Sequence, residues 1–310
     1  MVHKLALVGV GKIARDQHIP ALSQNPDFEL AATASRNASV DGVEAFSDLA
    51  TLLEARPDIT CISLCTPPQF RYPDAYLALA AGKHVMLEKP PGATLCEVHN
   101  LEAMAKKSGV SLFATWHSRH AAAVNAASAW LRDKTLQKVD VLWKEDVRHW
   151  HPGQDWIWEA GGLGVFDPGI NALSILTAIL PSPIHLSKAT LSFPENRDTP
   201  VAAELEFYEQ SGARVTASFD WLKEGQPEWD IHISTLEGDA ILKAGGGEFL
   251  IGGAPVNLGL DASAGEYPSL YQRFGELLNQ KTSEIDLSPM RHVADAFTIA
   301  RRVNAPAFEW

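Results

Sequence analysis

The sequence has few cysteines and no excess of positive charge. Its 310 residues include three cysteines, and 26 Lys and Arg residues stand against 38 Asp and Glu residues, which gives a formal net charge of −12. Three cysteines do not make a disulfide framework, so we expect Cys61, Cys65 and Cys96 to be reduced. The negative charge and the lack of basic blocks argue against nucleic acid or an anionic membrane as a partner.

The chain also lacks a long apolar run, a signal-peptide pattern, an internal repeat and a low-complexity segment. Residues 1–4 lead directly into a short strand pattern. No apolar run approaches the roughly 20 residues that cross a bilayer. We therefore expect a soluble, cytoplasmic protein. With 310 residues, of which 46% are hydrophobic, the chain is long enough for two globular domains.

The first third of the chain alternates short apolar runs with helical patterns. The predicted strands are residues 5–8, 29–34, 59–65, 85–87 and 111–115, and the predicted helices are residues 13–22, 48–56, 73–81 and 95–107. Short continuous apolar runs are typical of strands that are buried on both faces of a parallel sheet. The alternation predicts an α/β domain at residues 1–120, a Rossmann doubly wound parallel sheet that binds its ligand at the carboxyl ends of the strands.

A dinucleotide-binding pattern follows the first predicted strand. Gly9, Gly11 and Ala14 match G-x-G-x-x-A, where the first glycine permits a tight turn, the second admits the pyrophosphate and the small third residue packs the helix on the sheet. The helix at 13–22 would direct its N-terminus at the phosphates. We predict that Gly9, Gly11, Lys12, Ile13 and Ala14 bind the cofactor.

Ser35 and Arg36 follow the second predicted strand, where NAD-preferring proteins place an acidic residue for the ribose hydroxyls. A hydroxyl and a guanidinium suit a 2′-phosphate, and no carboxylate is present to repel it. We therefore predict that both residues bind the cofactor and that NADP is accepted at least as well as NAD. The alternative is that Arg36 is an ordinary surface arginine.

Two later strand ends carry further candidate residues. Thr66 and Pro67 follow the third predicted strand, and we expect them beside the cofactor, unless this turn only ends the strand. Glu88 and Lys89 follow the fourth predicted strand and also belong to the predicted cofactor site. A lysine at such an edge can be desolvated for proton transfer, so Lys89 is a predicted catalytic residue; the alternative is a solvated lysine in a turn.

The remainder of the chain changes pattern. The predicted strands there are residues 139–146, 186–193, 201–208, 214–221, 229–235, 240–243 and 249–251. Strands joined by short polar turns predict a second α+β domain at residues 121–310 with a largely antiparallel, open-faced sheet. Helices are predicted at 121–132, 269–279 and 289–304, and we expect the last one to pack back on the first domain.

Residues 148–159 carry three of the nine tryptophans and two histidines. Aromatic faces beside hydrogen-bonding groups suit a pyranose, whose ring faces are apolar and whose rim is polar. The alternative is that the tryptophans pack this loop on the core. His149 and His151 could pair on a metal ion, but no third ligand is evident, so we predict no metal site.

Asp167 and Asn171 lie four residues apart in a predicted helix that runs to Leu180, so both side chains project from one face. A carboxylate and an amide there could orient a lysine and a substrate hydroxyl. Asp167 could also cap the helix, and the two roles are compatible.

Three motifs in this order carry a resemblance to a known family. Gly9–Ala14, Glu88-Lys89-Pro90 and Gly161–Asn171 together resemble the glucose-fructose oxidoreductase, inositol dehydrogenase and MocA family of NAD(P)-dependent sugar oxidoreductases, across the whole chain. Within it, the chain looks most like the bacterial L-arabinose and D-galactose 1-dehydrogenases. Where many members carry histidine four residues after the aspartate, this chain has Asn171. An amide cannot titrate, so proton transfer would fall on Lys89.

The resemblance implies an enzyme that oxidises an aldopyranose (D-galactose, L-arabinose or a close relative) at C1 to the aldonolactone, with hydride transfer to nicotinamide. Lys89 would accept the proton of the C1 hydroxyl, Asp167 would orient Lys89 and Asn171 would hold the hydroxyl. The residues that match sugar-contacting positions are His117, Glu145, Trp150, His151, Trp156, Asp167, Asn171 and Trp229. Family members often dimerise through the open sheet face, so a homodimer is also implied.

Two other functions stay open at this point. The chain could be an inositol dehydrogenase or another sugar dehydrogenase or reductase that acts at a different carbon. It could also be a non-catalytic, sugar-responsive regulator that binds NAD(P), because the same fold serves cofactor-sensing proteins. The combination of Lys89, Asp167 and Asn171 counts against a regulator.

Overall fold

The chain forms two compact units in a computed structural model that describes residues 2–259 and 265–310. The first unit comprises residues 2–117 and 265–286, and the second comprises residues 118–259 and 287–310. Among these described residues, no helix has the length and the apolar character that crossing a bilayer requires. The cytoplasmic location stays a prediction.

The first unit is built on a parallel sheet of six strands, which confirms the predicted fold, in the order β3-β2-β1-β4-β5-β6. The strands are β1 (His3–Val8), β2 (Phe28–Ala34), β3 (Glu44–Phe46), β4 (Cys61–Leu64), β5 (His84–Leu87) and β6 (Leu112–Ala114). We did not predict β3, because two of its three residues are exposed and leave no apolar pattern. The strand order reverses between β1 and β4, where folds of this class bind dinucleotides.

Helices connect these strands. A π-helical turn at Ala14–His18 continues as α1 (Ile19–Ser23), and α2 (Leu49–Ala55), α3 (Pro68–Ala80) and α4 (Leu95–Ser108) follow along the chain. Helix α3 begins before the predicted residue 73, because Pro68 has no N–H to leave unpaired and suits a first turn. Helix α4 begins with a capping box between Thr94 and Glu97 and ends at Gly109, whose φ is +67°.

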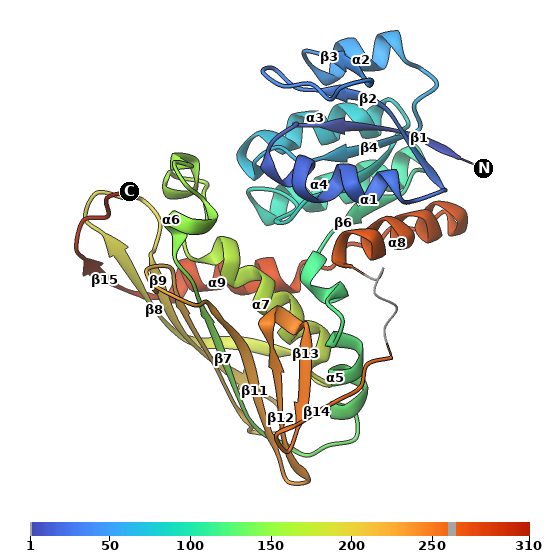
Figure 1. Ribbon diagram of the computed structural model, residues 1–310. Coiled ribbons are helices and arrows are strands. Elements are labelled where there is room, and N and C mark those ends of the chain that lie inside the picture. The colour runs from blue at the N-terminus through green and yellow to red at the C-terminus, as the bar shows by residue number, and fades with distance from the viewer. Residues whose placement is uncertain (1, 260–264) are drawn as a thin grey trace. The chain divides into compact units, whose positions relative to one another are not determined.

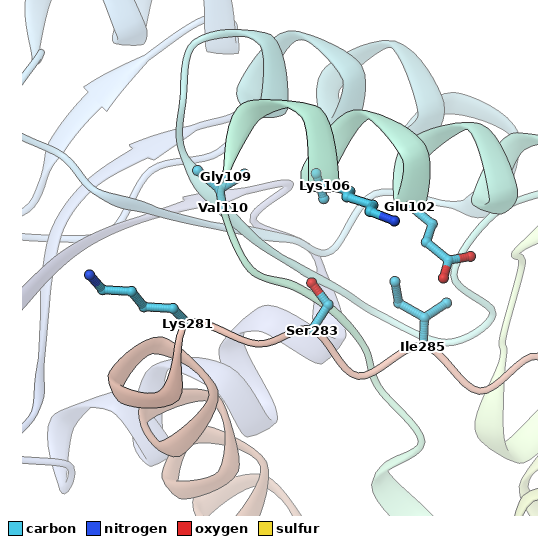
Figure 2. A pocket seen from close by; sticks show the side chains of 8 residues that line it. Glu102, Lys106, Gly109, Val110, Lys281, Ser283 and Ile285 are labelled. Carbon is cyan, nitrogen blue, oxygen red and sulfur yellow. The ribbon is translucent and has the colours of Figure 1, made fainter.

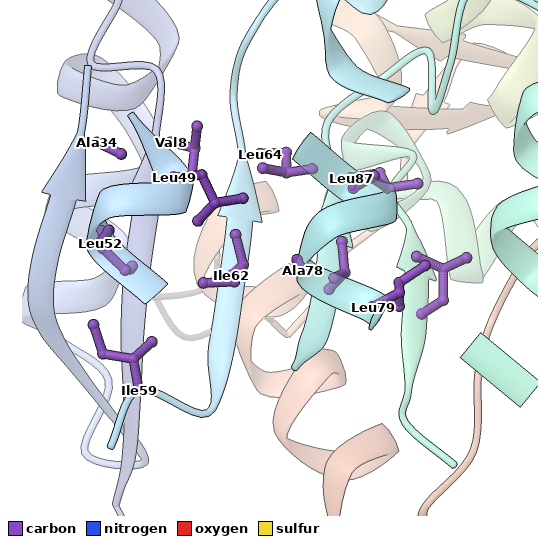
Figure 3. Packing of buried hydrophobic residues seen from close by; sticks show 14 of the residues in the cluster. Val8, Ala34, Leu49, Leu52, Ile59, Ile62, Leu64, Ala78, Leu79 and Leu87 are labelled. Atoms are coloured by element: carbon purple, nitrogen blue, oxygen red, sulfur yellow. The ribbon is translucent and has the colours of Figure 1, made fainter. Parts of the chain in front are cut away.

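Apolar side chains fill the space between helices α2, α3 and α4 and one face of the sheet. Figure 3 shows Leu49 and Leu52 of α2 and Leu79 of α3 beside Ile62 of β4 and Leu87 of β5, all within one buried cluster. Burying side chains of this size contributes about 2 kcal/mol each to folding. This packing holds the strand ends in place, and the candidate residues follow those ends.

Helix α8 (Glu266–Gln280) covers the other face of this sheet, although it follows the strands of the second unit in sequence. Its Leu270, Tyr271 and Phe274 pack with Leu5 and Phe28 in a second buried cluster. The rings of Phe274 and Phe28 stack with centroids 5.7 Å apart. Helix α8 also contacts α1, beside which it lies in Figure 1.

The second unit contains a nine-stranded sheet in the order β14-β13-β12-β11-β7-β10-β9-β8-β15. The strands are β7 (Leu136–Lys144), β8 (Ile184–Pro194), β9 (Ala202–Glu209), β10 (Arg214–Asp220), β11 (Glu228–Thr235), β12 (Gly238–Lys243), β13 (Glu248–Ile251), β14 (Ala254–Pro255) and β15 (Arg301–Ala305). Most neighbours are antiparallel, as predicted, whereas β7 pairs in parallel with β10 and β8 with β15.

Helices pack on one face of this second sheet. They include α7 (Phe166–Ile179) and α9 (Ser288–Ile299), and α5 (Val124–Leu131) packs on α7. The single turn α6 (Val147–Trp150) follows β7. Helix α7 contacts β7, α9 contacts β8, and the two helices pack against each other. Exposed polar side chains mark the opposite face, where Lys188 pairs with Glu206 at 2.8 Å beside Glu204, so the sheet is open-faced as predicted.

The helix predicted at 289–304 was wrong in its end. Helix α9 ends at Ile299, residues 301–305 form β15 in parallel with β8, and both elements belong to the second unit. Phe297 of α9 packs on Phe166 of α7, with ring centroids 5.6 Å apart, and this contact holds α9 there. The helix that returns to the first unit is α8, because its aromatic face matches the uncovered apolar face of that sheet.

Candidate active site

The glycines of the predicted fingerprint lie where β1 ends. Gly9 has a φ of +87°, and a Cβ atom added to it would lie 2.9 Å from Cγ2 of Thr66, so a larger residue fits neither the backbone conformation nor the space. Gly9 and Thr66 are thus brought together, one after β1 and the other after β4. Gly11 has no atom within 4 Å of such a Cβ position, which leaves room for a phosphate to approach the backbone.

The rest of the fingerprint begins the helical turn that follows. Lys12 and Ile13 are exposed, whereas Ala14 is buried against the sheet, as its small side chain allows. Lys12 forms an ion pair with Asp16 one turn later. Lys12 therefore adds little net positive charge here, and the backbone N–H groups of the turn are the donors suited to a pyrophosphate.

Two further observations fit a dinucleotide. Ser35 follows β2, where its N–H donates to Phe46 O at 2.9 Å, and the neighbouring Arg36 is exposed to any ligand at this strand end. Thr66 has a buried Oγ1 atom for which the described residues provide no hydrogen-bond partner. A hydroxyl or phosphate group of a bound dinucleotide could supply this hydrogen bond. Pro67 precedes α3 and leaves this threonine at the strand end.

Lys89 follows β5 at the same edge of the sheet and is half-buried. Its backbone N–H donates to Oε2 of Glu88 at 2.7 Å, and the Lys89–Pro90 peptide bond is cis. The buried guanidinium of Arg71 donates to the carbonyl oxygens of Glu88 and Pro90, and its Nε donates to Thr66 O at 3.1 Å. Arg71 therefore holds the backbone on both sides of Lys89 and ties it to the end of β4.

Glu88 is the centre of a buried polar network. Its Oε1 accepts a hydrogen bond from Tyr267 at 2.7 Å and pairs with His18 Nε2 at 2.9 Å, and Nδ1 of His18 lies 2.7 Å from the hydroxyl of Tyr271. Burial opposes the charge of Glu88, but the hydrogen bond and charge of His18 outweigh it and hold the pKa of Glu88 well below its usual value. Burial raises the pKa of Tyr267, so its hydroxyl stays a donor.

His117 follows β6 and contacts helix α8. Its Nδ1 lies 2.7 Å from Oε2 of Glu266, and its ring stacks on Tyr267 with centroids 5.5 Å apart. Sequence reasoning missed Glu266, Tyr267 and Tyr271, because they lie far along the chain from the strand ends that they contact. Tyr267 and Tyr271 are four residues apart on α8, and that spacing was the available sign of a shared face.

In the second unit, Glu145 follows β7 and is buried among indoles. Its Oε2 accepts a hydrogen bond from Nε1 of Trp229 at 2.8 Å, and its Oε1 accepts one from Nε1 of Trp221 at 3.2 Å. The exposed Trp150 packs on Trp229 with ring centroids 5.3 Å apart. The structure thus brings together three predicted sugar contacts, and it adds Trp221, whose position after β10 is set by long-range pairing.

His151 meets the carboxylate of helix α7. Its Nε2 lies 3.3 Å from Oδ2 of Asp167, which is buried, and Nδ1 of His151 lies 3.5 Å from Oε1 of Gln154, which also accepts a hydrogen bond from Trp156 at 3.3 Å. The N-cap of α7 is Val165, so the interpretation of Asp167 as the cap was wrong. Asn171 lies one turn after Asp167 on α7 and is half-buried.

Close packing and the segment 308–310 hold the loop that carries His151. A Cβ atom added to Gly162 would lie 2.5 Å from Ile157 O, so only glycine allows this approach. The buried ring of Phe308 packs on Trp158 with centroids 4.7 Å apart, and Trp310 Nε1 donates to Oδ1 of Asp155 at 2.8 Å. These contacts restrain residues 155–158, next to the predicted sugar-contacting positions.

We also searched the described residues for a metal site and for a cavity. The described residues contain no group of three or more His, Cys, Asp or Glu side chains arranged to hold a metal ion. A cavity of about 460 Å³ lies in the first unit. Figure 2 shows its lining residues Glu102 and Lys106 of α4 and Lys281 and Ser283, which follow α8. Its lining, as far as the structure describes it, includes none of the predicted site residues.

Comparisons with known proteins agree with this description. The model of an oxidoreductase family with an NAD-binding Rossmann fold, GFO/IDH/MocA, matches residues 3–115. Galactose 1-dehydrogenase of Pseudomonas fluorescens is 44% identical over 305 residues, which are 98% of this chain and 98% of that protein. The crystal structure of D-galactose-1-dehydrogenase from Rhizobium etli covers 99% of this chain and 98% of its own, with a TM-score of 0.95 and 54% identity.

A more distant structure shares the architecture. A 3-ketoreductase from Actinomadura kijaniata, in complex with NADP and TDP-benzene, covers 99% of this chain and all of its own, with a TM-score of 0.82. Its sequence identity is 18%, so this likeness shows the fold alone. The similarity that bears on activity is the one that runs end to end at 44% and 54% identity.

Proposed function

The chain belongs to the GFO/IDH/MocA oxidoreductase family, and from this premise we propose that it oxidises an aldopyranose, D-galactose, L-arabinose or a close relative, at C1 to the aldonolactone. It is a homologue of galactose 1-dehydrogenase and hence an enzyme rather than a regulator. The proposed substrate rests on the similarity of this chain to two galactose dehydrogenases over almost its whole length. Because that similarity includes the second unit, it reaches beyond the cofactor-binding fold.

The proposed cofactor site uses the strand ends of the first unit. The nicotinamide, when bound, accepts the hydride from the sugar carbon. The backbone of Gly9, Gly11, Lys12, Ile13 and Ala14 binds the pyrophosphate, Ser35 and Arg36 bind the adenosine ribose with its 2′-phosphate, and Thr66 and Pro67 lie against the remainder. Lys89 accepts the proton that the C1 hydroxyl loses.

The proposed sugar site uses the indole and carboxylate cluster of the second unit. Trp150 and Trp229 offer aromatic faces to the ring, and Glu145 and His151 offer hydrogen-bonding atoms to the hydroxyls. The other proposed substrate residues are Trp156, Asp167 and Asn171 of the second unit and His117 of the first unit. Asp167 and Glu145 are buried, and His151 and the indoles of Trp221 and Trp229 hold their carboxylates in fixed positions.

A panel of aldoses with both cofactors tests this proposal. Absorbance of the reduced nicotinamide gives kcat/KM for each sugar, and chromatography of the product separates a lactone from a ketone. We expect D-galactose or L-arabinose to give the highest kcat/KM and the product to be the lactone. A ketone product, or turnover of inositol alone, would move the reaction to another carbon and overturn the proposal.

Arg36 is expected to set the cofactor preference. Replacing Arg36 with alanine should lower kcat/KM for NADP by about 10-fold to 100-fold and leave NAD nearly unchanged, since a charge-assisted bond to the 2′-phosphate is lost. The measurement compares kcat/KM for the two cofactors at saturating sugar. Arg132→Ala, which removes an exposed arginine of the second unit, is the control. An unchanged NADP preference in Arg36→Ala would identify Arg36 as a surface residue.

The open face of the nine-stranded sheet is a proposed dimer interface. Tyr208 is 52% exposed there, next to the Lys188–Glu206 pair, and such a face can be shared by two copies related by a two-fold axis. Sedimentation velocity gives the mass in solution. A monomer at micromolar concentration would rule this assembly out.

A further inference from the structure

The contacts of Glu88 point to a role other than cofactor binding. Its side chain is 4% exposed, and the described residues occupy both carboxylate oxygens: His18 and Tyr267 at Oε1, and the Lys89 N–H at Oε2. A carboxylate held at both ends is rigid. Through the hydrogen bond at Oε2, this carboxylate also restrains the backbone of Lys89.

A second set of contacts restrains the same backbone from the opposite side. Arg71 donates to the carbonyl oxygens that precede and follow Lys89, those of Glu88 and Pro90. The N–H of Lys89 and the two flanking carbonyl groups are thus all engaged by buried charged side chains. A solvated lysine in a turn keeps its conformational freedom, so restraining the backbone of Lys89 in this way has an entropic cost.

Helix α8 supplies the outer part of the frame. Tyr267 donates to Glu88 from the first turn of α8, and Tyr271 contacts Nδ1 of His18 one turn later. The apolar side of the same helix is locked against Phe28 through Phe274. A buried ion pair such as His18–Glu88 contributes little net stability, because the cost of desolvation offsets the attraction between the charges.

We propose that Glu88, His18 and Tyr267 are positioning residues that fix Lys89 for proton transfer, with Arg71 as the clamp on its backbone. The proposal rests on the proposed function only for the proton transfer; the positioning of Lys89 can be observed without turnover. Displacement of a reacting group by about 1 Å can cost roughly 100-fold in rate, and that is the scale expected when the network is broken.

Two variants break the network at different points. Glu88→Gln removes the charge that pairs with His18 and should lower kcat about 100-fold. Tyr267→Phe removes one hydroxyl and should lower kcat about 10-fold, as expected for a lost hydrogen bond to a charged group. The dissociation constant of NADPH, from the fluorescence of the bound nicotinamide, should stay within about threefold, and kcat is expressed per NADPH-binding site so that unfolded protein does not count.

The matched control is Tyr72→Phe. Tyr72 also belongs to the first unit and donates to Asn100 Oδ1 at 2.7 Å, the same length as the Tyr267–Glu88 bond, but this bond lies outside the network. Tyr72→Phe should keep native kcat. If it lowers kcat as much as Tyr267→Phe does, the loss reflects general destabilisation and the proposal fails.

Hydrogen exchange of the Lys89 amide supplies a readout without activity. The two residues after Lys89 are prolines, which have no N–H, so a short peptide isolates this amide for mass spectrometry. Exchange should be about 10-fold faster in Glu88→Gln and in Tyr267→Phe, with α2 as the unchanged reference, since the acceptor is weakened or loosened.

The outcomes separate the two proposals. Loss of kcat with retained NADPH affinity and faster Lys89 exchange supports the positioning role. Loss of NADPH affinity in Glu88→Gln with native kcat overturns it and returns Glu88 to the cofactor site, as predicted from the sequence. A native protein without activity on any aldose overturns the proposed function, and the exchange rates then decide the positioning role by themselves: unchanged exchange refutes it, and faster exchange supports it.

Discussion

Replacing Lys89 with alanine should lower kcat by about 1,000-fold to 10,000-fold while NADPH affinity stays within about threefold of the native value. The amine is the proposed acceptor of the C1 hydroxyl proton, and alanine has no group that can take it. The residue is half-buried after β5, and its backbone is held by Glu88 and Arg71, so truncation of the side chain leaves the surrounding fold in place. The loss should therefore appear in kcat and not in cofactor binding.

Initial rates with saturating sugar and cofactor measure this effect, and fluorescence titration measures the affinity for NADPH. Lys83→Ala is the matched control, because Lys83 precedes the same strand at its opposite end and donates to Ile59 O at 2.7 Å. The control should keep native kcat. If Lys89→Ala keeps kcat within about threefold of native, the assignment of Lys89 as the proton acceptor is wrong.

Asp167→Asn should lower kcat/KM for the sugar by roughly 100-fold, with the affinity for NADPH unchanged. Asparagine has nearly the same shape, so the buried position on α7 stays filled while the negative charge is lost. His151 then loses its charged partner at 3.3 Å, and the proposed sugar site loses both the charge and the orientation of the imidazole.

The measurement is kcat/KM for D-galactose and L-arabinose, together with the thermal midpoint of unfolding. Asp140→Asn is the control, since Asp140 also accepts a hydrogen bond, from Thr216 at 2.8 Å, but belongs to strand β7 on the open side of the sheet. A fall in thermal midpoint with native kcat/KM in Asp167→Asn would make this carboxylate structural and remove it from the proposed catalytic residues.

Local sequence patterns predicted most of the strands and helices of the fold. Short apolar runs such as 5–8 and 85–87 became β1 and β5, because a strand buried on both faces needs apolar residues throughout. Alternation along β9 and β10 likewise marked strands with one covered face. Strand β3 was missed because it is short and exposed, and the helix predicted at 289–304 ran too far because its last residues pair with β8 as strand β15.

The candidate site divides in the same way. Gly9, Thr66 and Lys89 were predictable from the sequence, because residues that follow parallel strands collect at one edge of the sheet. Tyr267, which donates to Glu88 across 179 positions of the chain, was not predictable, because no local pattern encodes a partner at that separation. The pairing of Trp221 with Glu145 falls in the same class.

The sequence by itself determined the fold class, the family and the strand ends at which the chemistry is proposed, because each depends on local periodicity and short motifs. Only the tertiary structure decided what surrounds Lys89. The hydrogen bonds of Glu88 and the backbone contacts of Arg71 form when distant segments pack together, and the contact with His18 then lowers the pKa of Glu88 against the opposing effect of burial. Packing and desolvation are properties of the folded chain, and they cannot be read from the order of its residues.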